Sequence, residues 1–174
     1  MRKLPFFIVA LLTLCLVAGC GQSQADKKAE KDKQVAAAAK KKEEARVKKI
    51  GETGALCKKL VQDFADSLDN LNSRLDVGIK PDDYSSRLGD ISVAYNKVNW
   101  DETPNQYCLK SVGIPLESAY REFAAAGDTW NNCISDYNCD VEKDKLPAMQ
   151  KKWSHAGKLM EKSKAALEDF QLDD

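Results

Sequence analysis

Cysteines are the residues of this 174-residue chain whose chemistry is easiest to read from sequence. Cys15 and Cys20 lie in and just after an apolar N-terminal run. Four more follow, Cys57, Cys108, Cys133 and Cys139. No two of them form a Cys-x-x-Cys pair, and the single histidine is far from all of them in sequence. A thiol metal or redox site needs such neighbours, so disulfide formation is the favoured alternative for these four.

A second group of candidate ligands is an acidic stretch after residue 135. Oxygen-bearing side chains occupy every second position there, namely Asp136, Asn138, Asp140, Glu142 and Asp144. This alternation resembles the first half of a calcium-binding loop. The resemblance fails at Val141, where a glycine makes the turn, and at Pro147, where a bidentate glutamate closes the site. The five residues are therefore weak metal candidates, and the alternative is a solvated loop closed by Cys133 and Cys139.

No catalytic set can be assembled from the remaining residues. His155 has no partner at a recognisable spacing, and the chain has neither a Ser-His-Asp order nor a G-x-S-x-G elbow. We therefore expect a non-enzymatic protein without a cofactor. Trp100 and Tyr107 lie in a long predicted loop, where binding residues concentrate. They are the candidates for contact with a protein partner.

The N-terminus has the pattern of a targeting segment. Arg2 and Lys3 precede an apolar run from Leu4 to Val17, which ends in Val17-Ala18-Gly19-Cys20. This ending resembles the lipobox of bacterial lipoproteins, in which the cysteine is acylated and becomes the mature N-terminus. The resemblance implies a signal peptide at 1–19 and a lipid anchor such as palmitate on Cys20. Gly21 after the cysteine implies the outer membrane if the organism is Gram-negative.

Charge divides the mature chain into two parts. Residues 25–50 carry a net charge of +5, whereas residues 51–174 carry −7. The first part is nearly all Ala, Lys, Glu, Asp and Gln, which predicts a solvated tether at residues 20–50, helical or disordered. Its basic excess suits either a plain spacer or contact with anionic headgroups or wall polymers. The acidic second part argues against nucleic acid binding.

Four segments of residues 51–174 have helical periodicity. They are Leu56–Leu75, Tyr84–Val98, Leu116–Tyr137 and Leu146–Phe170. Breaks at 76–78, 100–113 and 135–145 separate them, and Gly127 in the third permits close backbone approach. The pattern predicts an all-α, four-helix up-and-down bundle, with Leu56, Trp130, Tyr137 and Trp153 on its inward stripes.

An exported chain with four cysteines is expected to hold two disulfides. Up-and-down topology favours Cys57–Cys108 at one end of the bundle and Cys133–Cys139 at the other.

The functional expectation is a lipid-anchored protein of the cell envelope, held at the membrane through Cys20, that binds or scaffolds an envelope protein. One alternative is a lipoprotein that binds a small molecule or calcium. Another is an inhibitor or immunity-type surface lipoprotein. None of the three has a motif in the bundle that selects it.

Overall fold

The computed structural model of the protein describes residues 24–172, and every regular element in that range is helical. The α-helices are α1 Gln24–Val77, α2 Pro81–Lys97, α3 Ile114–Ile134 and α4 Leu146–Leu172. Three short helical turns lie between them, η1 Trp100–Glu102, η2 Cys108–Gly113 and η3 Val141–Lys145. The chain forms two compact units that divide between Glu44 and Ala45. The predicted all-α bundle with two disulfides is confirmed.

The part of the first unit that is described is a stretch of α1. Side chains from Lys27 to Glu44 are all exposed, as expected for a segment rich in alanine and charged residues. Of the two predicted states of the tether, helix or disorder, the structure has helix here. Ion pairs one turn apart, such as Lys40–Glu44 at 3.9 Å, add modest local support.

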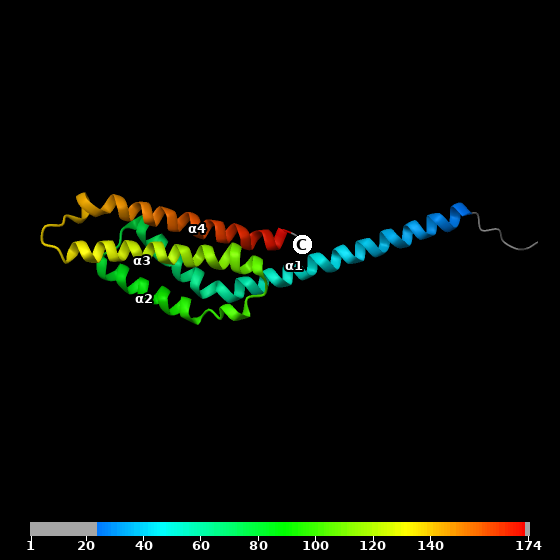
Figure 1. The fold of residues 1–174 in the computed structure, drawn as a ribbon, viewed down its shortest axis with the longest axis horizontal. Coiled ribbons are helices and arrows are strands. Elements are labelled where there is room, and N and C mark those ends of the chain that lie inside the picture. The colour runs from blue at the N-terminus through cyan, green and yellow to red at the C-terminus, as the bar shows by residue number, and fades with distance from the viewer. Residues whose placement is uncertain (1–23, 173–174) are drawn as a thin grey trace, which may run out of the picture. The chain divides into compact units, whose positions relative to one another are not determined.

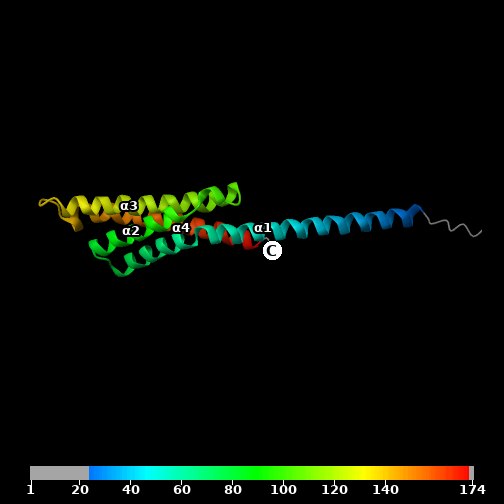
Figure 2. The same ribbon diagram turned by 90° about the horizontal axis from the view of Figure 1, so that it is seen from below.

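The second unit is the helical bundle. α4 runs alongside α3 and α2 packs against α3, as both ribbon views show (Figures 1 and 2). The chain reverses at each connection, so the predicted up-and-down order is correct. Gly78 adopts a φ of 89° in the α1–α2 connection, a conformation that costs glycine least. Pro81 opens α2 in the first helical position, where its missing N–H leaves no hydrogen bond unmade.

Aromatic side chains form two layers of the bundle core. In one layer Phe64 of α1 lies against Tyr95 of α2, with ring centroids 5.3 Å apart, and against Tyr120 of α3. In the other, Tyr84, Trp130 and Trp153 form a triangle of tilted rings 5.5 to 6.0 Å apart. Tilted arrangements of this kind stabilise aromatic pairs beyond their buried area. The two layers join all four helices.

Two disulfides close the bundle at opposite ends, with the predicted pairing. Cys57–Cys108 joins α1 to the start of η2 and spans 51 residues of sequence. Cys133–Cys139 spans 6 residues in the α3–α4 connection, which lies at the far end of the bundle from the η1–η2 connection (Figure 1).

Close packing at Gly127 is also confirmed. A methyl group built there would lie 2.7 Å from Leu88 Cδ1 and 3.1 Å from Tyr84 Cε1. Such distances are too short for carbon contacts, so glycine is what lets α2 and α3 approach each other at this level.

Two residues that were predicted on the inward stripes, Leu56 and Tyr137, are instead exposed. Leu56 is 59 % exposed, because at this level of α1 the next residue, Cys57, lies on the inward face and is buried instead. Tyr137 is fully exposed, since α3 ends at Ile134 before reaching it. Ile50, assigned to the tether, is partly buried against the core. Trp130 and Trp153 do pack against the core as predicted.

Candidate binding groove

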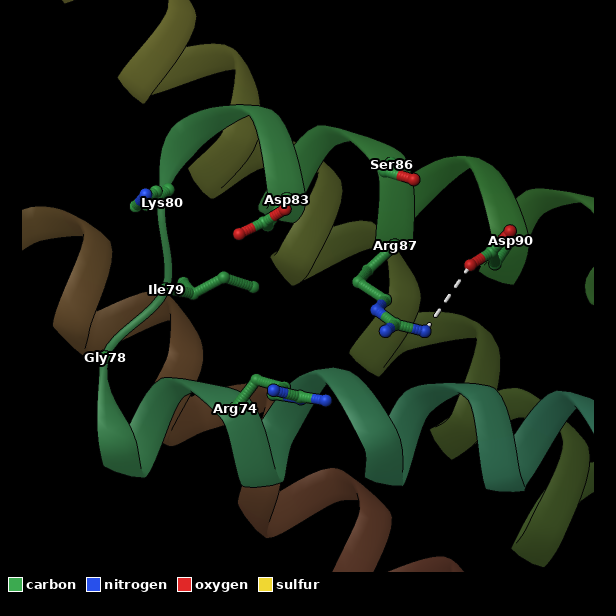
Figure 3. Close-up of a pocket in the computed structure, with 8 residues that line it drawn as sticks. All are labelled: Arg74, Gly78, Ile79, Lys80, Asp83, Ser86, Arg87 and Asp90. Atoms are coloured by element: carbon green, nitrogen blue, oxygen red, sulfur yellow. Dashed lines mark ion pairs between the residues drawn. The ribbon is translucent and has the colours of Figure 1, made fainter.

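A groove of about 680 Å³ lies between the end of α1 and the first half of α2. Figure 3 shows it from the side. Its lining residues are Arg74, Gly78, Ile79, Lys80, Asp83, Ser86, Arg87 and Asp90. The volume lies in the range of sites that hold small ligands.

The sequence of α2 explains why its polar face borders the groove. Tyr84 and Ile91 are seven residues apart and fully buried, which fixes one face of the helix inward. Asp83, Arg87 and Asp90 are four and three residues apart, so they share another face. The turn at Gly78 folds α2 back so that this face lies opposite Arg74 of α1.

The side chains that line the groove carry charges of both signs, with a small excess of positive charge. Arg87 points from α2 toward α1, and the side chain of Arg74 lies along the edge of α1 that faces α2 (Figure 3). Arg87 lies 3.7 Å from an Asp90 carboxylate oxygen, a long contact between two partly exposed groups that adds little stability. Lys80 and Asp83 complete a lining of three cations and two carboxylates. A guanidinium group suits a carboxylate or phosphate, which it binds through two parallel hydrogen bonds.

A smaller hollow continues the groove along α1. It measures about 240 Å³ and shares Arg87 and Asp90 with the larger one. Asp66, Ser67 and Asn70 of α1 form its other wall. A ligand larger than a single anionic group therefore has polar surface to follow along the α1–α2 seam.

The acidic stretch after residue 135 uses its carboxylates to order the backbone. Asp140 accepts hydrogen bonds from the amides of Glu142 and Lys143, and Asp144 accepts one from the amide of Asp140 at 2.9 Å. Asp136 likewise accepts from the amide of Asn138. The hydrogen bonds made by Asp140 and Asp144 are the reciprocal capping expected at the start of a helix. Within residues 24–172, no three His, Cys, Asp or Glu side chains are grouped closely enough to hold a metal ion.

His155 has an acidic neighbour on the adjacent helix. Its Nδ1 lies 3.0 Å from a carboxylate oxygen of Glu122, while the imidazole is 57 % exposed. Lys152 approaches the other oxygen of Glu122 at 4.0 Å. Glu122 thus contacts both His155 and Lys152 at the surface and connects α3 with α4, as expected of a surface histidine.

Trp100 and Tyr107, the predicted contact residues, have different surroundings. Trp100 is partly buried, with its ring against Tyr95 and over Gly113. Tyr107 is 43 % exposed and lies edge-on to Phe170 with ring centroids 4.8 Å apart. Of these two residues, Tyr107 offers the more exposed aromatic surface, beside a hollow bordered by Ile50 and Asp169.

The groove was not among the residues selected from sequence. Its charged residues are spread over two helices and look like any solvated helix face until the α1–α2 turn brings them together. The alternation of Asp83, Arg87 and Asp90 on the face beside Tyr84 was the available signal. It is not specific, because charged residues occupy the outer face of most amphipathic helices.

Comparison with protein-family models, with curated proteins and with solved structures gives no match for this chain. The lipobox-like residues Val17 to Cys20 lie outside the described residues. No helix within residues 24–172 has the length and apolar character required to cross a bilayer.

Proposed function

We propose that this protein is a lipid-anchored, non-enzymatic binding module of the bacterial cell envelope, which holds a ligand or partner segment in the groove between α1 and α2. The anchor part of the proposal is supported by the lipobox-like sequence ending at Cys20. Acyl chains there would keep the protein at the membrane without help from the bundle. The bundle would then be free to bind.

The observation that carries the binding part is the pair of guanidinium groups in the groove. Arg74 and Arg87 come from different helices and line a shared hollow of about 680 Å³. Since guanidinium groups bind carboxylates and phosphates through paired hydrogen bonds, the ligand class is one with an exposed anionic group. The carboxylates of Asp83 and Asp90 would accept a donor from the same ligand. An acidic peptide segment or a phosphorylated envelope component has both features.

The test is a crosslinking pull-down from native envelopes with the lipidated protein and a double variant, Arg74→Gln with Arg87→Gln. Lys151→Gln with Lys158→Gln is the matched control, because it removes the same charge from exposed positions on α4. Loss of the captured species in the arginine variant alone, with that species chemically unchanged after release, is the expected result. Equal capture by all three proteins would overturn the groove as the binding site. The mass of the native N-terminus tests the anchor separately.

A protein contact around Tyr107 is the second candidate. It is favoured by the partial exposure of Tyr107 and its position against Phe170. Tyrosine is enriched at binding hot spots. Tyr107→Ala in the same pull-down would lose the partner if this patch binds it, whereas Trp100→Ala would also disturb packing over Gly113.

A further inference from the structure

A different surface, on the helix of the first unit, has a one-sided arrangement of charge. At 3.6 residues per turn, six residues between 27 and 42 fall within an arc of about 100° around the helix. They are Lys27, Lys28, Lys31, Val35, Ala38 and Lys42. We name this set the basic face. Every one of these side chains is exposed, and Val35 is 61 % exposed.

Acidic residues of the same stretch lie outside the arc. Glu30, Asp32, Glu43 and Glu44 all occupy helix positions away from the basic face at about 100° per residue. Lys33, Lys40 and Lys41 also fall outside it, and Lys40 is paired with Glu44 at 3.9 Å. The helix therefore has one side with four lysines and no carboxylate, and other sides where charges of both signs alternate.

We infer that the basic face lies against an anionic phospholipid surface next to the anchor. This inference rests on the anchor of the proposed function, since a lipidated Cys20 would keep the helix close to a bilayer. Three residues lie between Cys20 and the start of α1 at Gln24, a distance of at most about 15 Å for an extended chain. The first lysines of the basic face then lie within reach of the headgroups.

Charge and composition both favour this occupant. Lysines near an anionic bilayer attract it within about one Debye length, roughly 10 Å at moderate salt. Val35 and Ala38, in the middle of the basic face, offer small apolar surface toward the headgroup region without the bulk that drives deep insertion. A helix with this face toward lipid would lie along the membrane surface.

The experiment uses the full mature chain with Cys20→Ser, so that no acyl chain masks the weaker attraction. Its binding is measured by sedimentation with phosphatidylcholine vesicles, with and without phosphatidylglycerol. The test variant carries Lys28→Gln, Lys31→Gln and Lys42→Gln. The control carries Lys33→Gln, Lys40→Gln and Lys41→Gln, which changes net charge equally on other faces. Glutamine and lysine have similar helix propensity, and circular dichroism checks that the helix persists.

We expect the test variant to partition roughly 100-fold less onto anionic vesicles, because it lacks three lysines that attract the lipid. Since each 1.4 kcal/mol is about tenfold, this loss corresponds to about 3 kcal/mol. The control should lose less than about tenfold, because its lysines are farther from the lipid. Equal losses in the two variants would overturn the assignment of the face. Binding that does not depend on phosphatidylglycerol, or that is seen with wall polymers and not with vesicles, would overturn the lipid as occupant.

Failure of this inference and failure of the proposed function give different results. The vesicle assay contains no acylated cysteine, so a negative outcome leaves the anchor and the groove as they stand. An unmodified native N-terminus would remove the anchor, yet the vesicle measurement would still report on the basic face.

Discussion

Trp153 of α4 donates its indole N–H to the phenolic oxygen of Tyr84 of α2 across 3.0 Å, although 69 positions separate the two residues. The Tyr84 hydroxyl in turn donates to the carbonyl of Phe123 in α3 at 2.7 Å. One buried hydroxyl thus connects three helices of the bundle. It also holds α2 in the rotation that places Arg87 in the groove.

Removing this hydroxyl should destabilise the bundle. Tyr84→Phe leaves the Trp153 N–H and the Phe123 carbonyl without their partner, which costs about 1 to 3 kcal/mol for a buried group. The free energy of unfolding in urea measures the loss. Tyr107→Phe is the control, because Tyr107 is 43 % exposed and its hydroxyl has water available. A Tyr84→Phe value as small as that of the control would show that the shared hydrogen bonds contribute little.

Stability should fall at high pH through the same residue. Burial raises the pKa of the Tyr84 phenol, an effect that the hydrogen bond from Trp153 only partly offsets. The unfolded chain releases this proton near its ordinary pKa of about 10, whereas the folded protein retains it. The contribution is therefore fully present below about pH 10 and is lost as the pH rises above that value.

The free energy of unfolding, measured with urea from pH 8 to pH 11, should accordingly decline as the pH rises. This decline should be shallower in Tyr84→Phe than in the wild type. Burial also raises the pKa of Tyr95, so the variant keeps part of the decline. An identical slope in the wild type and in Tyr84→Phe would contradict the assignment to Tyr84.

Two helical glycines should respond oppositely to alanine. Gly127→Ala places a methyl group 2.7 Å from Leu88 Cδ1, and such overpacking costs about 1 to 3 kcal/mol. Gly89→Ala has no atom within 4 Å of the new methyl group. Its gain in helix propensity should stabilise the bundle by about 0.5 to 1 kcal/mol. Melting temperatures of the two variants give the comparison, and a stabilised Gly127→Ala would mean that α2 moves aside without cost.

The two disulfides should contribute unequally. A bridge stabilises mainly by restricting the unfolded chain, so the loop it closes sets the size of the effect. Cys57–Cys108 spans 51 residues and Cys133–Cys139 spans 6, which predicts losses of about 4 and about 2 kcal/mol for replacement of each pair by alanine. Urea unfolding of the two double variants measures the difference. A larger loss from the short loop would point to strain or local order in place of chain entropy.

The positions of the helices and turns can be predicted from the sequence, because they depend mainly on residues that are close together in the chain. Apolar spacing gave four helices, and Pro81 and Gly78 mark the α1–α2 turn with the residue types that such a turn needs. The cysteine pairing followed from topology, since an up-and-down bundle brings Cys57 and Cys108 to one end. The alanine- and lysine-rich composition of the tether also predicted a solvated segment, of which residues 27–44 are exposed helix.

Tertiary packing decided what periodicity leaves open. A stripe of leucines is compatible with a small rotation of the helix, so burial of Cys57 and exposure of Leu56 depended on where α1 meets its neighbours. The groove likewise exists only because the turn at Gly78 and the anchoring of Tyr84 set Arg74 and Arg87 across one hollow. Contacts between residues far apart in sequence fix such rotations, and those contacts are formed only in the folded bundle.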